Sequence, residues 1–200
     1  MSENRKEEII MATLKLASVH GLRAVSMSMI AKEVGIKKPS LYNHFKSKEE
    51  LVCDMYLFLK NKAQKETRTQ MDLSIFDKKS AYEILSTLVN NYVTLSSKSY
   101  MQMFYKVIYS ERAISREASR IMVVETEKMI DATNKVFNVL KNKNLLKFEN
   151  LEINAISFAL TIHSIIDYSF DKCLSENKKL LTNFKLIDEF ISNFCNEHKC

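Results

Sequence analysis

The sequence is poor in residues that interrupt helices. It contains two glycines and one proline, namely Gly21, Gly35 and Pro39, and all three precede residue 40. Because no residue type after Pro39 breaks a helix by itself, the remainder is expected to form helices joined by polar turns. The composition therefore predicts an all-α fold, and 200 residues are enough to bury a core.

Long apolar runs and clustered cysteines are also missing. No apolar run reaches the ~18 residues that a membrane span needs, and the polar start MSENRKEE is unlike a signal peptide. We therefore expect a cytoplasmic protein with no membrane partner. The four cysteines form no CxxC pair and are expected to be free thiols. The terminal spacing of Cys195, His198 and Cys200 loosely resembles a metal motif, but a chain end holds ligands poorly, so neither a metal nor a cofactor is expected.

Positive charge is concentrated near the N-terminus. The net charge is +6, and residues 21–48 hold six cations against one anion. Residues 149–200 hold five cations against eight anions. This partition favours a polyanion as the partner of the N-terminal part, whereas a uniformly solvated surface would not produce it.

The stretch from Ser26 to Leu51 has the pattern of two short helices joined by a tight turn. Ser26 is suited to capping a first helix, and Gly35 supplies the left-handed conformation that ends it. Pro39 fits the first position of a second helix, which is expected to run to about Phe45. Leu41 and Phe45 are four residues apart and can face inward, which leaves the polar side chains of this helix able to donate hydrogen bonds to DNA.

This stretch resembles the DNA-binding region of the TetR (tetracycline-repressor) family. The motifs that carry the resemblance are IAKEVGI, KKPSLYNHF and SKEEL, with an upstream helix from Ile9 to Gly21, so it covers about the first quarter of the chain. The resemblance implies phosphate contacts by Tyr42 and Lys48. Lys37, Lys38 and Asn43 are expected to reach base edges, although phosphate contact alone remains the alternative for Lys37. The predicted DNA-binding residues are Ser26, Ser28, Lys37, Lys38, Pro39, Ser40, Tyr42, Asn43, His44 and Lys48.

The rest of the chain is expected to form a helical ligand-binding and dimerisation domain. We predict a helix-turn-helix domain over residues 1–48, a second domain over 49–200 and about nine helices in total. The expected later helices are 48–71, 80–96, 100–109, 115–143, 150–174 and 180–195. Methionines and tyrosines on several of these helices suit an adaptable pocket, with ordinary core packing as the alternative for each one. The predicted ligand-binding residues are Tyr92, Met101, Phe104, Tyr105, Ile108, Tyr109, Met122 and Met129.

The last two helices carry more apolar surface than one subunit is expected to cover. A homodimer built from them would set two recognition helices about 34 Å, or a small multiple of it, apart. The predicted interface residues are Ile156, Leu160, His163, Phe184, Ile187, Ile191 and Phe194. For His163, a hydrogen-bonded core or interface histidine is favoured over a ligand or metal contact.

The sequence thus favours a homodimeric repressor that a small hydrophobic effector releases from a palindromic operator in double-stranded DNA. The alternative is a helical carrier or adaptor whose N-terminal module binds protein. An enzyme is not expected, because the chain has no Gly-rich phosphate loop and no HExxH or GxSxG motif.

Overall fold

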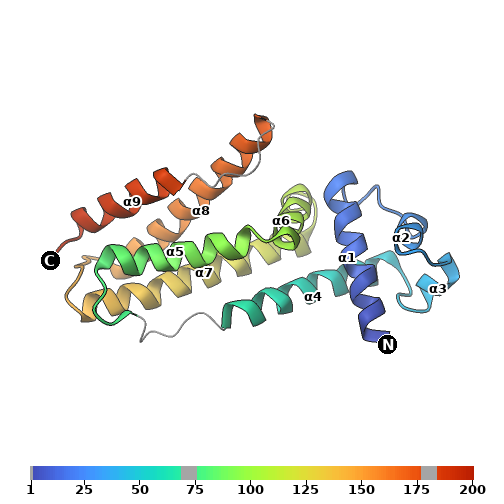
Figure 1. Ribbon diagram of the computed structural model, residues 1–200, viewed down its shortest axis with the longest axis horizontal. Coiled ribbons are helices and arrows are strands. Elements are labelled where there is room, and N and C mark those ends of the chain that lie inside the picture. The colour runs from blue at the N-terminus through green and yellow to red at the C-terminus, as the bar shows by residue number, and fades with distance from the viewer. Residues whose placement is uncertain (1, 69–75, 177–183) are drawn as a thin grey trace. The chain divides into compact units, whose positions relative to one another are not determined.

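The computed structural model describes residues 2–68, 76–176 and 184–200 (Figure 1). These residues form nine helices and no strand, apart from one isolated antiparallel bridge between Leu146 and Lys199. The all-α prediction is confirmed. The helices are α1 (Ser2–His20), α2 (Met27–Val34), α3 (Lys38–Tyr42), α4 (Lys48–Arg68), α5 (Ala81–Ser96), α6 (Ser99–Glu111), α7 (Arg116–Asn142), α8 (Leu151–Ser175) and α9 (Phe184–Glu197).

The chain divides into two compact units. The first takes in residues 1–71 and 95–122, so it holds α1 to α4, α6 and the start of α7. The second takes in residues 72–94 and 123–200, so it holds most of α5 and α7 together with α8 and α9. The units are therefore interleaved in sequence. The predicted functional boundary between residues 48 and 49 remains a prediction.

The core of the first unit joins the three N-terminal helices to α4 and α6. Ile9 and Leu14 of α1 pack with Ile30 of α2, Leu41 of α3 and Leu59 of α4, and all five side chains are fully buried. On α6, Met101, Phe104 and Ile108 belong to the same core. The aromatic rings of Tyr56 and Phe104 meet edge to face with centroids 6.2 Å apart, so α4 packs directly against α6.

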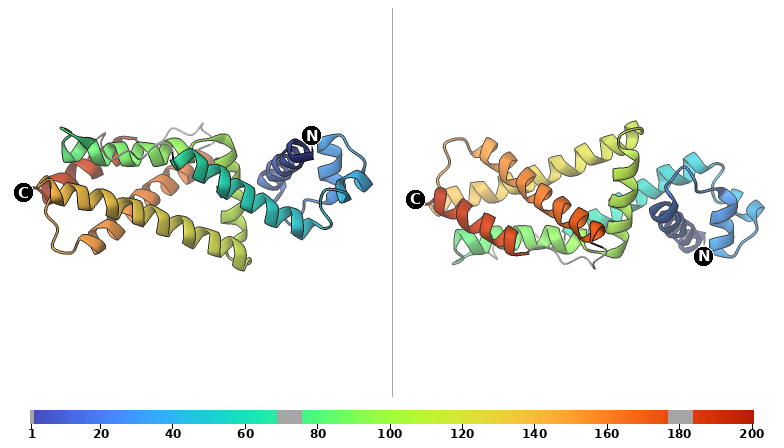
Figure 2. Two further views of the ribbon diagram at one scale, coloured as in Figure 1. Left: turned by 90° about the horizontal axis from the view of Figure 1, so that it is seen from below. Right: turned by 90° about the horizontal axis from the view of Figure 1, so that it is seen from above.

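The core of the second unit contains a cluster of phenylalanines. Phe137 of α7 stacks on Phe148, with ring centroids 4.7 Å apart, and makes an edge contact with Phe158 of α8 at 5.5 Å. Phe194 of α9 lies 4.9 Å from Phe158. Figure 2 shows α5, α7, α8 and α9 from two further sides. Packing of this kind fixes the C-terminal helices to one another, because each ring buries a large apolar area.

Within the described residues, no helix has both the length and the apolar character that crossing a bilayer requires.

Candidate nucleic-acid interface

The first helix of the predicted pair begins and ends on hydrogen bonds that its sequence predicts. The Ser26 hydroxyl accepts a hydrogen bond from the backbone N–H of Met29 at 3.2 Å, which caps α2. Gly35 has φ +71°, and its N–H donates to the carbonyl of Lys32 at 3.2 Å. The N–H of Ile36 donates to the carbonyl of Ala31 at 2.9 Å. This pair of bonds is a Schellman motif, which ends α2 sharply and turns the chain toward α3.

The second helix, α3, is shorter than expected, since it ends at Tyr42 and not near Phe45. Lys37 is extended before it, and Pro39 is its second residue. The turn nevertheless continues, because the N–H of Phe45 donates to the carbonyl of Leu41 at 3.1 Å. Leu41 and Phe45 are both fully buried, so they hold the inner side of α3 against the first core.

The outer side of α3 is polar and exposed. Tyr42 is 43% exposed, although an aromatic side chain is more often buried. The exposed predicted DNA-binding residues are Ser26, Ser28, Lys37, Lys38, Pro39, Ser40, Tyr42 and Asn43, while His44 and Lys48 are half-buried. The structure therefore gathers the whole predicted set on two neighbouring helices and their flanks.

Lys48 has a partner inside the unit. Its ammonium donates a hydrogen bond to the backbone carbonyl of Arg23 at 3.2 Å, which links the start of α4 to the segment before α2. The start of α4 is itself capped: the Ser47 hydroxyl accepts from the N–H of Glu50, and the Glu50 carboxylate accepts from the N–H of Lys46 at 2.6 Å. Two cations that follow α3, Lys46 and Lys48, thus make hydrogen bonds within the unit.

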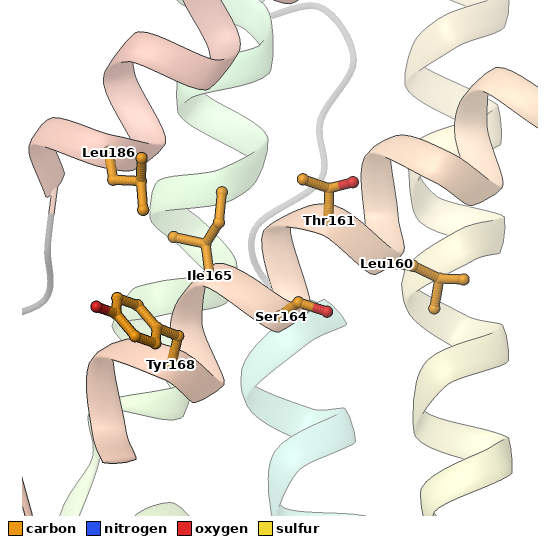
Figure 3. A pocket seen from close by; sticks show the side chains of 6 residues that line it. All are labelled: Leu160, Thr161, Ser164, Ile165, Tyr168 and Leu186. Carbon is orange, nitrogen blue, oxygen red and sulfur yellow. The ribbon is translucent and has the colours of Figure 1, made fainter. Parts of the chain in front are cut away.

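A hollow of about 410 Å³ lies on the outer face of α8 in the second unit (Figure 3). It is lined by Leu160, Thr161, Ser164, Ile165 and Tyr168 of α8 and by Leu186 of α9. Only Leu160 belongs to the predicted dimer residues. Tyr168 and Ile153, which are not among the predicted residues, lie eight and seven residues from Leu160 along α8, a spacing that places all three on one helix face.

Burial corrects part of the predicted dimer interface. Ile187, Ile191 and Phe194 lie in the second unit's own core, so their apolar side chains are covered without a partner subunit. The amphipathic pattern of α9 predicts a surface for a second copy, but Phe194 of this face packs against Phe137 of α7 and Phe158 of α8 in the same chain. Ile156 is half-buried, and Phe184 opens α9 with its side chain outside the described part of the chain.

His163 makes a hydrogen bond within the second unit. Its Nδ1 lies 3.0 Å from the Tyr92 hydroxyl, and its Nε2 lies 3.6 Å from the Asp167 carboxylate.

The predicted ligand-binding residues are divided between the units. Tyr92 and Met129 are half-buried in the second unit, whereas Met101, Phe104, Tyr105, Ile108, Tyr109 and Met122 belong to the first.

His198, the histidine of the metal-like spacing at the C-terminus, has both ring nitrogens in hydrogen bonds within the chain. His198 Nδ1 donates to the carbonyl of Phe194 at 3.0 Å, so Nε2 accepts from the Asn154 amide at 2.8 Å. Both ring nitrogens are thus engaged, and the ring also stacks on Phe194 with centroids 4.2 Å apart. Across residues 2–68, 76–176 and 184–200, the structure groups no three histidine, cysteine or acidic side chains in a way that could hold a metal ion.

Two named relatives match the chain, one over little more than half of it and the other over most of it. YerO of Bacillus subtilis, described as an uncharacterized HTH-type transcriptional regulator, is 28% identical over 130 residues, which are 57% of this chain and 45% of YerO. The chain thus spans less than half the length of that relative. The HTH-type transcriptional regulator QacR of Staphylococcus aureus is 23% identical over 193 residues, which are 92% of this chain and 96% of QacR.

Solved structures share the fold over nearly the whole chain. A TetR-family transcriptional regulator from Mesorhizobium loti superposes with a TM-score of 0.73 at 16% identity and covers 100% of this chain and 99% of its own. The SmeT structure, described as a triclosan complex, gives 0.68 at 14% identity and covers 98% and 91%.

The family model described as "Bacterial regulatory proteins, tetR family" matches residues 9–55. That segment runs from the second turn of α1 to the first turns of α4, so it contains α2, the Gly35 turn and α3. The matched segment thus has the DNA-binding region that this family model describes, and the chain as a whole shares the fold of the solved TetR-family structures.

Proposed function

We propose that this protein is a ligand-responsive transcription regulator that binds a palindromic operator as a homodimer. The observation that carries the proposal is the two-sidedness of α3. Leu41 and Phe45 are fully buried, whereas Ser40, Tyr42 and Asn43 next to them are exposed hydrogen-bonding groups. A short helix that presents donors outward on a buried apolar base suits insertion into a major groove.

The electrostatics of the segment support DNA as the partner. Residues 21–48 hold six cations against one anion, and Lys37 and Lys38 are exposed at the start of α3. Base edges are read near the start of a recognition helix, where a lysine pairs well with guanine O6 and N7. Asn43 is suited to bidentate contact with adenine, and Tyr42 and Lys48 to phosphates. We assign these roles accordingly.

The effector is proposed to be small and hydrophobic. The half-buried Tyr105 and Tyr109 of α6 form an aromatic pair with ring centroids 6.3 Å apart, next to the buried Phe104. Aromatic surface of this kind, with a few polar tips, suits an apolar ligand. The triclosan named for the SmeT structure is a further reason to test small organic molecules.

The dimer is proposed to form through the outer face of α8. Ile153, Leu160 and Tyr168 are 54%, 42% and 55% exposed, which is unusual for large apolar side chains on one helix face. A twofold contact there would bury the hollow of Figure 3 against its own copy. Such a dimer would present two α3 helices to one operator, and effector binding would then act on their spacing to release the repressor.

Selection of bound sequences from a random DNA library tests the proposal. We expect enrichment of a twofold palindrome, bound by two subunits as counted by sedimentation of the complex. Enrichment of an asymmetric site, or no enrichment at low salt, would count against it. A titration of mixed-sequence DNA at two salt concentrations separates a DNA-binding protein from a protein-binding adaptor, because only the former shows a steep salt dependence.

A further inference from the structure

Lys6 of α1 lies against the end of the recognition helix. Its ammonium is 5.3 Å from the centre of the Phe45 ring. Phe45 itself extends the turn after α3, since its N–H donates to the Leu41 carbonyl. Lys6, which is far from α3 in sequence, therefore places a cation near the C-terminal end of α3.

The acidic side chains that follow Lys6 on α1, as far as the structure describes them, pair with other cations. Glu8 pairs with Arg5 at 2.7 Å, and Glu7 pairs with Lys62 of α4 at 3.6 Å. Among the described side chains, no carboxylate forms an ion pair with Lys6, which is exposed. The contact with the Phe45 ring holds the ammonium in position and leaves its charge in place.

We propose that Lys6 binds a DNA phosphate at the edge of the groove that α3 enters, and so extends the DNA contact surface onto α1. This inference rests on the proposed function. A helix in the major groove has a phosphate strand at each end, and phosphate contacts from flanking elements fix its register. An exposed cation beside the C-terminal end of α3 meets one of these strands.

A purely structural role for Lys6 makes a different prediction. In that case its aliphatic stem would cover the Phe45 ring, and the charge would be incidental. Substitution by methionine separates the two roles, because it keeps an unbranched apolar stem and removes the ammonium. Substitution by arginine keeps the charge.

The test is the salt dependence of binding to a mixed-sequence DNA duplex and to the selected palindrome. Each phosphate contact contributes about 0.9 to the slope of log K against log salt, so Lys6→Met is expected to flatten it by about 1.8 per dimer. Lys6→Arg should keep the wild-type slope. The matched control is Arg120→Met, which removes one cation from α7 of the same unit, where it pairs with Glu117 at 2.9 Å. Its slope should equal that of wild type.

Three results would overturn the inference. The first is an unchanged slope for Lys6→Met in a protein that binds DNA. The second is an equal loss for Lys6→Met and Arg120→Met, since net charge alone would then explain both. The third is a wild-type protein without salt-dependent DNA binding, which would refute the proposed function as well and is recognised from the wild type alone. Thermal unfolding of each variant confirms that the compared proteins are folded.

Discussion

Lys62 of α4 lies 3.6 Å from the carboxylate of Glu7 on α1 and also 5.2 Å from the ring centre of Tyr100 on α6. A third contact, 5.6 Å to the Phe58 ring, holds the lysine stem along α4. One cation thus joins three helices of the first unit.

Replacing Lys62 by methionine is expected to lower the free energy of unfolding by about 1 kcal/mol. The ion pair is partly exposed and contributes little, so most of the loss comes from the two aromatic contacts. Glu7→Gln removes only the ion pair and should cost roughly 0.5 kcal/mol or less. Urea unfolding of both variants measures the difference. Equal losses would mean that the contacts with Phe58 and Tyr100 contribute nothing.

Asn43 and Tyr42 are expected to respond differently to truncation. Asn43→Ala should relax the preference at one base position of the operator by ~1–3 kcal/mol, because a bidentate contact to adenine is lost. Tyr42→Ala should weaken binding to all sequences about equally, because a phosphate contact carries no sequence information. Binding-site selection with both variants measures these effects. An unchanged preferred sequence and specificity ratio for Asn43→Ala would refute its assignment.

Much of the N-terminal segment was predictable because its signals are local. Ser26, Gly35 and Pro39 each impose a backbone conformation on their immediate neighbours. The cap and the left-handed turn lie where Ser26 and Gly35 predict, and α3 begins at Lys38, one residue before the predicted start at Pro39. The end of α3 was less predictable. Phe45 has the spacing of a helical residue, but the regular helix ends at Tyr42 and only turn-like hydrogen bonds continue.

Gly35→Ala tests the left-handed turn directly. No atom lies within 4 Å of a Cβ built at this position, so the cost comes from φ +71° and not from a clash. We expect a loss of about 1 kcal/mol, and a smaller loss for Gly35→Asn, since asparagine tolerates this conformation better. Thermal unfolding measures both. Equal stability of Gly35→Ala and wild type would show that the turn relaxes to another conformation.

The partners of the apolar helix faces were not predictable from their pattern. Ile187, Ile191 and Phe194 lie on one face of α9, and that spacing identifies a buried face without identifying what covers it. Phe148 completes the cluster from outside any helix, stacked on Phe137 across a turn that no periodicity marks. Nor does periodicity indicate that α7 is shared between two compact units.

Cys195 is expected to react slowly with thiol reagents at pH 8. Burial raises the pKa of its thiol to about 11, so only about one molecule in a thousand carries the reactive thiolate at that pH. Cys53 and Cys200 are exposed and should be modified first. Labelling followed by mass spectrometry resolves the sites. Modification of Cys195 as fast as Cys53 would contradict the burial of this side chain, and Cys195→Ser serves as the control because it should leave the fast phase unchanged.

Leu160→Glu is expected to convert the proposed dimer into a monomer. Leu160 borders the hollow on α8 and is 42% exposed, so the substitution leaves the subunit's own core intact. In a twofold contact it would bury two carboxylates near each other and lose the apolar area of two leucines. These effects together should raise the dimer dissociation constant by a factor on the order of 100 or more.

The matched control is Ile114→Glu. Ile114 is 57% exposed in the turn between α6 and α7, so the same change there adds an equal charge to another apolar surface residue. Sedimentation of both variants, with thermal unfolding to verify folding, measures the outcome. We expect a folded monomer for Leu160→Glu that has lost affinity for the palindrome, and a dimer for Ile114→Glu. A Leu160→Glu variant that remains dimeric would place the subunit contact elsewhere than the outer face of α8.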